Sequence, residues 1–154
     1  MNYLQRLLAL PAWLGARIPE STVLLVARLA IASVFWRSVQ TKITGWQLFG
    51  QSFQFFHLSG STFMLFQYEY HLPLLSPTVA AYAGTFAEFF FSLMLAFGLF
   101  TRFAALGLIG VTAVIEFVYP DAWPTHILWF ALLLLLLRQG AGSFSLDRIL
   151  GWAR

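Results

Sequence analysis

Four long apolar stretches restrict the fold of this chain more than any other feature. They cover residues 21–41, 76–100, 103–118 and 123–137. A membrane-spanning helix needs about 20 predominantly apolar residues. Because unpaired backbone groups are not tolerated in hydrocarbon, and because the alternation typical of barrel strands is absent, each stretch is expected to be helical. The sequence therefore predicts an all-α fold, a membrane-spanning four-helix bundle.

The composition supports a membrane protein. Hydrophobic residues make up 60% of the 154 residues and charged residues only 10%, whereas soluble domains carry about 25% charged residues. A soluble chain of this length could not bury so much apolar surface. The composition excludes a soluble globular domain, a disordered chain and a nucleic-acid binder, and the lipid bilayer is the expected partner. We expect residues 1–154 to form a single integral membrane domain.

Three further segments are predicted to lie at the membrane interface. Residues 1–19 carry leucines at helical spacing beside Arg6 and Arg17, and residues 143–154 have a similar pattern. Both are typical of amphipathic segments on the membrane surface. The loop 42–75 is rich in aromatic residues and poor in charge. Its part around 53–66 is expected to form an interfacial or re-entrant helix over the outer mouth of the bundle.

Positive charges outside the spans are divided unequally between the two sides of the predicted bundle. One side holds only Lys42. The other side holds six arginines: Arg6, Arg17, Arg102, Arg138, Arg148 and Arg154. Cytoplasmic loops carry the excess of Lys and Arg in membrane proteins. Both termini are therefore predicted to be cytoplasmic, with the loop 42–75 and the short loop 119–122 facing outward.

Four charged residues lie inside the predicted spans: Arg28, Arg37, Glu88 and Glu116. Counted along each helix at about 1.5 Å per residue, Arg28 and Glu88 lie at one depth. Arg37 and Glu116 lie nearer the outer edge. Two structural ion pairs are predicted, Arg28 with Glu88 and Arg37 with Glu116. In the alternative, the Arg28 side chain extends to the cytoplasmic headgroups instead.

The same polar groups are candidates for ligand binding or proton relay: Arg37, Lys42, Glu88, Glu116 and His126. We expect them to face a polar cavity that opens outward. Hydrogen-bond donors and carboxylates of this kind suit a quinone or another small ligand and its protons. A packing seam without chemistry explains Glu88 equally well. No motif identifies a catalytic residue. Motifs for nucleotide binding and haem attachment are absent, but their absence does not exclude a bound quinone or chemistry carried out by a partner protein.

Those absent motifs mean that no nucleotide or covalent haem is expected on this chain. The chain also has no cysteine, so it carries no disulfide or thiolate site of its own. An alternative site is a metal centre on the outward side, formed by Glu69, His71 and His126. Imidazole and carboxylate groups bind divalent metals, although the spacing matches no established motif.

Three segments in order resemble the DoxX family. They are Leu25–Phe35 with Arg28, Gly98–Ala105, and the tail Gly140–Asp147 with its G-x-G-x-x-SLD pattern. The resemblance covers about residues 22–150. The segments YEYHLPLLSP and YPDAWPTH also resemble a bacterial subgroup that is associated with metal-stress and copper-sequestering peptides.

The resemblance implies a multi-pass protein of the bacterial inner membrane. Some members are described as the membrane subunit of a thiosulfate:quinone oxidoreductase, and others are linked to complexes that handle oxidative stress. We therefore expect an accessory membrane subunit of a redox or stress-response system, with redox or metal-handling proteins or further copies of the chain as partners. The alternatives are a non-enzymatic component for copper handling and a structural anchor. Whether the chain is an enzyme stays open; if so, it is a quinone-linked oxidoreductase subunit without catalytic cysteines.

Overall fold

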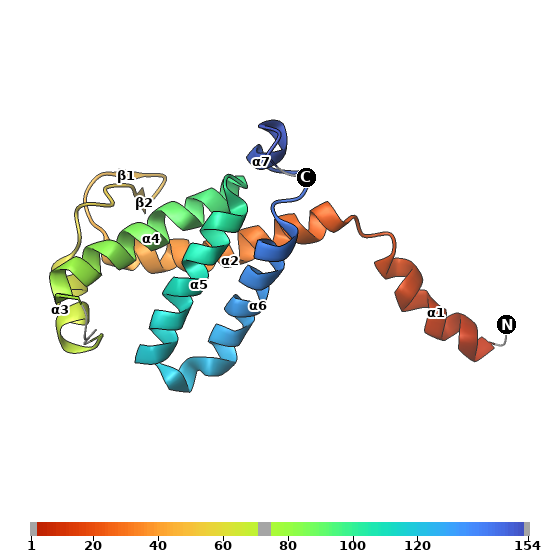
Figure 1. Cartoon of the computed structure of the whole chain (residues 1–154), viewed down its shortest axis with the longest axis horizontal. Coiled ribbons are helices and arrows are strands. Elements are labelled where there is room, and N and C mark those ends of the chain that lie inside the picture. The colour runs from red at the N-terminus through yellow and green to blue at the C-terminus, as the bar shows by residue number, and fades with distance from the viewer. Residues whose placement is uncertain (1–2, 71–74, 153–154) are drawn as a thin grey trace.

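The computed structural model describes residues 3–70 and 75–152 (Figure 1). Within these residues four helices are long and apolar enough to cross a membrane. They are α2 (Glu20–Lys42), α4 (Pro77–Phe97), α5 (Thr101–Val118) and α6 (Trp123–Gln139), the last preceded by a 3₁₀ turn η1 (Pro120–Ala122). The predicted all-α, membrane-spanning four-helix bundle is confirmed.

The four helices pack in a closed order around one apolar core. Helix α2 packs against α4, α4 against α5, α5 against α6, and α6 returns to α2. Each helix contributes fully buried side chains to this core, among them Phe35, Leu95, Leu108 and Leu133. An even number of crossings brings the beginning of α2 and the end of α6 to the same end of the bundle.

Gly98 ends α4 and sets the turn into α5. Its φ of 66° lies in the left-handed region, and the N–H of Leu99 donates to the carbonyl of Met94. This hydrogen bond is typical of a glycine-capped helix end. A side chain here would also collide with Arg28, whose Nη1 atom would lie 1.7 Å from an added Cβ. The predicted stretches 76–100 and 103–118 leave Thr101 and Arg102 between them, but both residues lie in the first turn of α5.

The loop between α2 and α4 contains two short strands and one helix. Strands β1 (Gln47–Leu48) and β2 (Gln51–Ser52) form an antiparallel hairpin that the sequence did not predict. Helix α3 (Gly60–Tyr68) packs against α4, and the Ser59 side chain caps its beginning. The helix expected around 53–66 is therefore present only in its second half, where Phe66 is buried against α4.

Both ends of the chain carry a helix outside the bundle core. Helix α1 (Tyr3–Gly15) extends away from the bundle (Figure 1) and continues through Pro11. Trp13 is half exposed, and the Arg17 guanidinium lies 3.8 Å from the centre of its ring. Helix α7 (Leu146–Ile149) is a single turn. Exposed apolar residues on both segments agree with the predicted contact with the membrane interface.

Asp147 fastens the C-terminal segment to the bundle. Its two carboxylate oxygens accept hydrogen bonds from the backbone N–H groups of Phe100 and Thr101, at 2.7 and 2.9 Å. Its own N–H donates to the carbonyl of Gly98. The first N–H groups of a helix have no partner within the helix. A distant carboxylate thus caps α5 and fixes the C-terminal segment at the end of the bundle where α2 begins.

Candidate functional site

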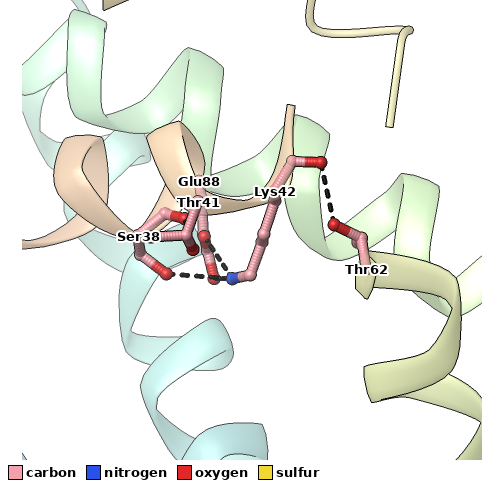
Figure 2. Close-up of polar contacts among 5 residues, drawn as sticks. All are labelled: Ser38, Thr41, Lys42, Thr62 and Glu88. Atoms are coloured by element: carbon pink, nitrogen blue, oxygen red, sulfur yellow. Dashed lines mark hydrogen bonds and ion pairs between the residues drawn. The ribbon is translucent and has the colours of Figure 1, made fainter. Parts of the chain in front are cut away.

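A buried ion pair joins the end of α2 to the middle of α4. The Lys42 Nζ atom lies 2.6 Å from each carboxylate oxygen of Glu88 and donates a third hydrogen bond to Ser38 Oγ at 2.9 Å (Figure 2). The two residues are 5% and 3% exposed. An ammonium group has three hydrogens to donate, so the Lys42 charge is fully satisfied by these acceptors.

Neighbouring elements hold the pair in place. Lys42 is the last residue of α2, where the helix dipole favours a cation. The Thr62 hydroxyl, near the beginning of α3, donates to the Lys42 carbonyl at 2.8 Å (Figure 2). Val39 and Phe89 belong to the apolar cluster beside the pair. These contacts hold the two charged groups at contact distance, and their attraction offsets the cost of burying each charge in an apolar environment.

The predicted pair of Arg28 with Glu88 is wrong. Glu88 is roughly 16 Å along α4 from its first residue, and α2 ends at that level with Lys42. The prediction counted depth from the outer end of each helix as if all four helices ended at one level. Arg28 is 1% exposed and donates from Nη2 to the carbonyl of Phe144. The Arg28 side chain therefore reaches the C-terminal segment at the end of the bundle where α2 begins, and its contact with lipid headgroups there stays a prediction.

The predicted pair of Arg37 with Glu116 is also wrong. Arg37 is exposed, whereas Glu116 Oε2 lies 2.6 Å from His126 Nδ1. His126 is buried and its ring packs against Trp129 with centroids 4.9 Å apart. Glu116 and His126 are ten positions apart on either side of the short turn between α5 and α6. Counting away from that turn on both helices would have found this pair from the sequence.

Glu88 lines an apolar cavity of about 240 Å³ between α3, α4 and α5. Its polar lining side chains are the Glu88 carboxylate and the Tyr70 phenol. The apolar lining residues are Phe66, Leu75, Ala80, Ala83, Gly84, Ala87, Gly110, Val111, Val114 and Ile115. Of these, Ala83, Gly110 and Val114 are exposed on the outer surface of the helices. The cavity therefore opens between α4 and α5, toward the side where lipid would lie.

The other member of the pair faces a different cavity. Lys42 lines a space of about 480 Å³ together with Thr41 and residues of α3, and Glu69 lies at its edge. The Lys42–Glu88 pair thus lies between two cavities. Arg37, Glu116 and His126 line neither of them. Among the residues that the structure describes, the five candidates do not share one of these cavities as expected.

Two tyrosines that the sequence analysis did not select lie beside this region. The Tyr119 hydroxyl donates to Glu69 Oε2 at 2.7 Å, and the rings of Tyr70 and Tyr119 meet edge to face. Burial, with Glu88 and Glu69 adding to it, raises the pKa of Tyr70 to about 12. Burial and then the hydrogen bond to Glu69 raise the pKa of Tyr119 as well. Both phenols therefore stay protonated at neutral pH and remain hydrogen-bond donors.

The residues proposed for a metal centre have separate partners. Glu69 accepts from Tyr119, and His126 pairs with Glu116. Over residues 3–70 and 75–152 no group of three or more His, Asp or Glu side chains is arranged to hold a metal ion. His71, the third proposed ligand, lies outside the described residues.

Comparison with known proteins identifies one family. The sequence model of the DoxX family matches residues 23–120. This range begins in α2, ends just after α5, and includes both members of the Lys42–Glu88 pair. No curated protein and no solved structure matches the chain. Because the matched range is well over half of the sequence and its helices have the predicted membrane-spanning character, the chain belongs to the DoxX family.

Proposed function

We propose that this protein is the quinone-binding membrane subunit of a redox system, and that the quinone ring binds in the cavity beside Glu88. The observation that carries the proposal is the cavity itself: an apolar space that opens toward lipid and has one carboxylate and one phenol in its wall. Ligand pockets typically combine an apolar lining with a few polar groups that fix orientation. A quinone is soluble in the bilayer and would enter between α4 and α5.

The two polar groups match the two oxidation states of such a ligand. The carbonyl oxygens of a quinone only accept hydrogen bonds, and the neutral Tyr70 phenol donates them. The hydroxyl groups of a quinol donate, and an ionised carboxylate such as Glu88 accepts. Conversion of quinone to quinol takes up two electrons and two protons. The chain has no cysteine, and we assign the electrons to a partner protein.

The position of the ion pair supports a role in proton transfer. Glu88 lines the cavity on the lipid side, and its partner Lys42 lines the cavity on the other side of the pair. In the conversion of quinone to quinol, protonated Glu88 would give its proton to a quinone oxygen as the partner protein supplies the electrons, and the ammonium of Lys42 would stabilise the carboxylate that remains. Further polar groups lie beyond the ends of the helices: Glu69 accepts a hydrogen bond from Tyr119, and the Tyr119 ring contacts the ring of Tyr70.

We also propose that the protein lies in the bacterial inner membrane with both termini in the cytoplasm. The exposed side chains of Arg102, Arg138 and Arg148 at the end of the bundle that carries the termini support this orientation. A cysteine in place of Ser61, which is exposed at the opposite end, should react with an impermeant label in intact cells. A cysteine in place of Gln139 is the matched control and should react only after lysis; the reverse pattern would contradict the orientation.

A cavity-filling variant tests the quinone site. Gly110 lines the cavity, and an added Cβ there meets no atom within 4 Å. Gly110→Leu should fill the opening and leave the ion pair intact. Ala113→Leu is the matched control, since Ala113 is exposed on the same helix but does not line the cavity. Binding of decylubiquinone to the purified protein in lipid nanodiscs should be lost in Gly110→Leu and retained in Ala113→Leu. Equal binding by both variants would contradict the proposal.

A further inference from the structure

A third cavity lies at the other end of the bundle from the Lys42–Glu88 pair. Its volume is about 630 Å³. The beginning of α2, the turn between α4 and α5, the end of α6 and the C-terminal segment form its wall. Because all four spanning helices begin or end here, the cavity lies at the level of the lipid headgroups.

Hydrogen-bond donors converge on this cavity. The exposed side chains of Arg102 and Arg148 line it from α5 and α7. Thr101 lines it as well and is only 1% exposed, yet its hydroxyl has no hydrogen-bond partner within the part of the chain that the structure describes. Leaving a buried hydroxyl without a partner costs about 1–3 kcal/mol. The hydroxyl oxygen is itself buried, so a ligand in the cavity does not reach it, and the two guanidinium groups are the side-chain donors that the cavity offers.

The two acidic residues of the cavity, Asp147 and Glu20, oppose an anionic ligand only weakly. Both oxygens of Asp147 already accept backbone N–H groups at the beginning of α5, and the partial positive charge of that helix end offsets its charge. Glu20 lies in the first turn of α2, where the helix dipole offsets its charge in the same way. The two guanidinium groups therefore dominate the electrostatic potential that a ligand meets in the cavity.

Aromatic side chains extend the cavity toward the bilayer. Phe100 stacks on Trp152 with ring centroids 4.7 Å apart, and Phe103 is exposed beside them. Aromatic rings are enriched at this level of membrane proteins because they contact glycerol and acyl groups while remaining near water. A free inorganic anion would gain nothing from this apolar wall, whereas a lipid would contact it with its glycerol backbone.

We propose that this cavity binds the phosphate group of a phospholipid, with Arg102 and Arg148 as its donors. Guanidinium groups form strong charge-assisted hydrogen bonds with phosphate. The lipid would fill the space between the bundle and the C-terminal segment. The proposal does not depend on quinone binding, which concerns residues of other cavities.

Thr101→Val gives an internal control. Valine has the shape of threonine, and the substitution removes a buried hydroxyl that bonds to no described residue. The free energy of unfolding of the delipidated protein should therefore stay the same or rise. The affinity for dioleoylphosphatidylglycerol, measured by native mass spectrometry of the full chain, should stay the same, because the shape of the cavity and its two arginines are unchanged.

The arginines are tested in the same measurement. Arg102→Gln and Arg148→Gln should each weaken lipid binding about tenfold, because each removes charge-assisted hydrogen bonds. Arg17→Gln is the control, since Arg17 is an exposed arginine of the same end that stacks on Trp13 and does not line the cavity. Lipid binding that is unchanged in both arginine variants would overturn the proposal.

Inorganic phosphate distinguishes a lipid from a free anion. We expect millimolar phosphate to displace little of the bound phosphatidylglycerol, because it lacks the contact with the aromatic wall. If inorganic phosphate binds as tightly as the lipid, with the same loss in the arginine variants, the cavity is an anion site and the assignment to a lipid is overturned.

Discussion

The ammonium nitrogen of Lys42 lies 2.6 Å from both carboxylate oxygens of Glu88, although the two residues are 46 positions apart in the chain. This contact joins the end of one spanning helix to the middle of another. It also places one charged group on each of two separate cavities. The stability of the bundle and the proposed chemistry therefore depend on the same two residues.

Breaking this pair should be more harmful than replacing it. Lys42→Met leaves an unpaired buried carboxylate and should lower the free energy of unfolding by about 3–5 kcal/mol. The double variant Lys42→Met/Glu88→Leu leaves no buried charge and should recover most of this loss. Reversible unfolding in detergent micelles measures both, with Arg37→Met as the exposed control. Losses that simply add in the double variant would show that the two charges do not interact.

A second double-mutant cycle should find coupling between Glu116 and His126. Their 2.6 Å contact predicts an interaction free energy of about 0.5–3 kcal/mol between Glu116→Gln and His126→Phe. Arg37 is exposed, so the cycle of Arg37→Ala with Glu116→Gln should be additive within about 0.5 kcal/mol. The opposite ranking of the two cycles would restore the pair of Arg37 with Glu116.

The long-range cap of α5 should contribute strongly to stability. Asp147→Ala removes two hydrogen bonds to the beginning of α5 and should cost about 3–6 kcal/mol, since hydrogen bonds to a charged group are worth about 1.5–3 kcal/mol each. Asp121→Ala is the control, because Asp121 is exposed in the η1 turn. Unfolding measurements that give the two variants equal stability would refute the role of this cap.

Alkaline titration should separate Tyr70 and Tyr119 from free phenols. Their raised pKa values, about 12 for Tyr70, mean that the fold favours the neutral phenol. This contribution to stability is complete below about pH 10, the ordinary pKa of tyrosine, and is lost as the pH rises toward about 12. Phenolate absorbance should show a late phase that Tyr70→Phe reduces. The denatured chain provides the reference titration of free phenols. An unchanged late phase in Tyr70→Phe would contradict the raised pKa of Tyr70.

The sequence was sufficient for the spanning helices because their limits depend on local residues. Pro77 begins α4, since a proline at the first turn of a helix loses no hydrogen bond. Gly98 ends the same helix in the left-handed conformation. The helix limits differ from the prediction by only a few residues wherever such a residue is present. The hairpin of β1 and β2 had no comparable local pattern and was not predicted.

The pairing of charges could not be predicted in the same way, because it depends on how far each helix is shifted along its neighbour. Lys42 was expected in the outer loop, yet it is the buried last residue of α2. Arg28 was expected to pair with a carboxylate and instead contacts the carbonyl of Phe144, which lies in a segment remote in sequence. These contacts follow from tertiary packing, which periodicity and residue depth do not specify.

The most direct measurement of the central claim is quinone binding to the apolar pair variant. Lys42→Met/Glu88→Leu should keep the fold, and the cavity remains between α3, α4 and α5. In lipid nanodiscs, the account predicts that reduced decylubiquinone binds to the wild-type protein and binds at least about tenfold more weakly to the folded double variant, because the carboxylate that accepts the quinol hydroxyl is gone. Equal affinity of the two proteins would contradict the account and leave Lys42 and Glu88 as a structural pair.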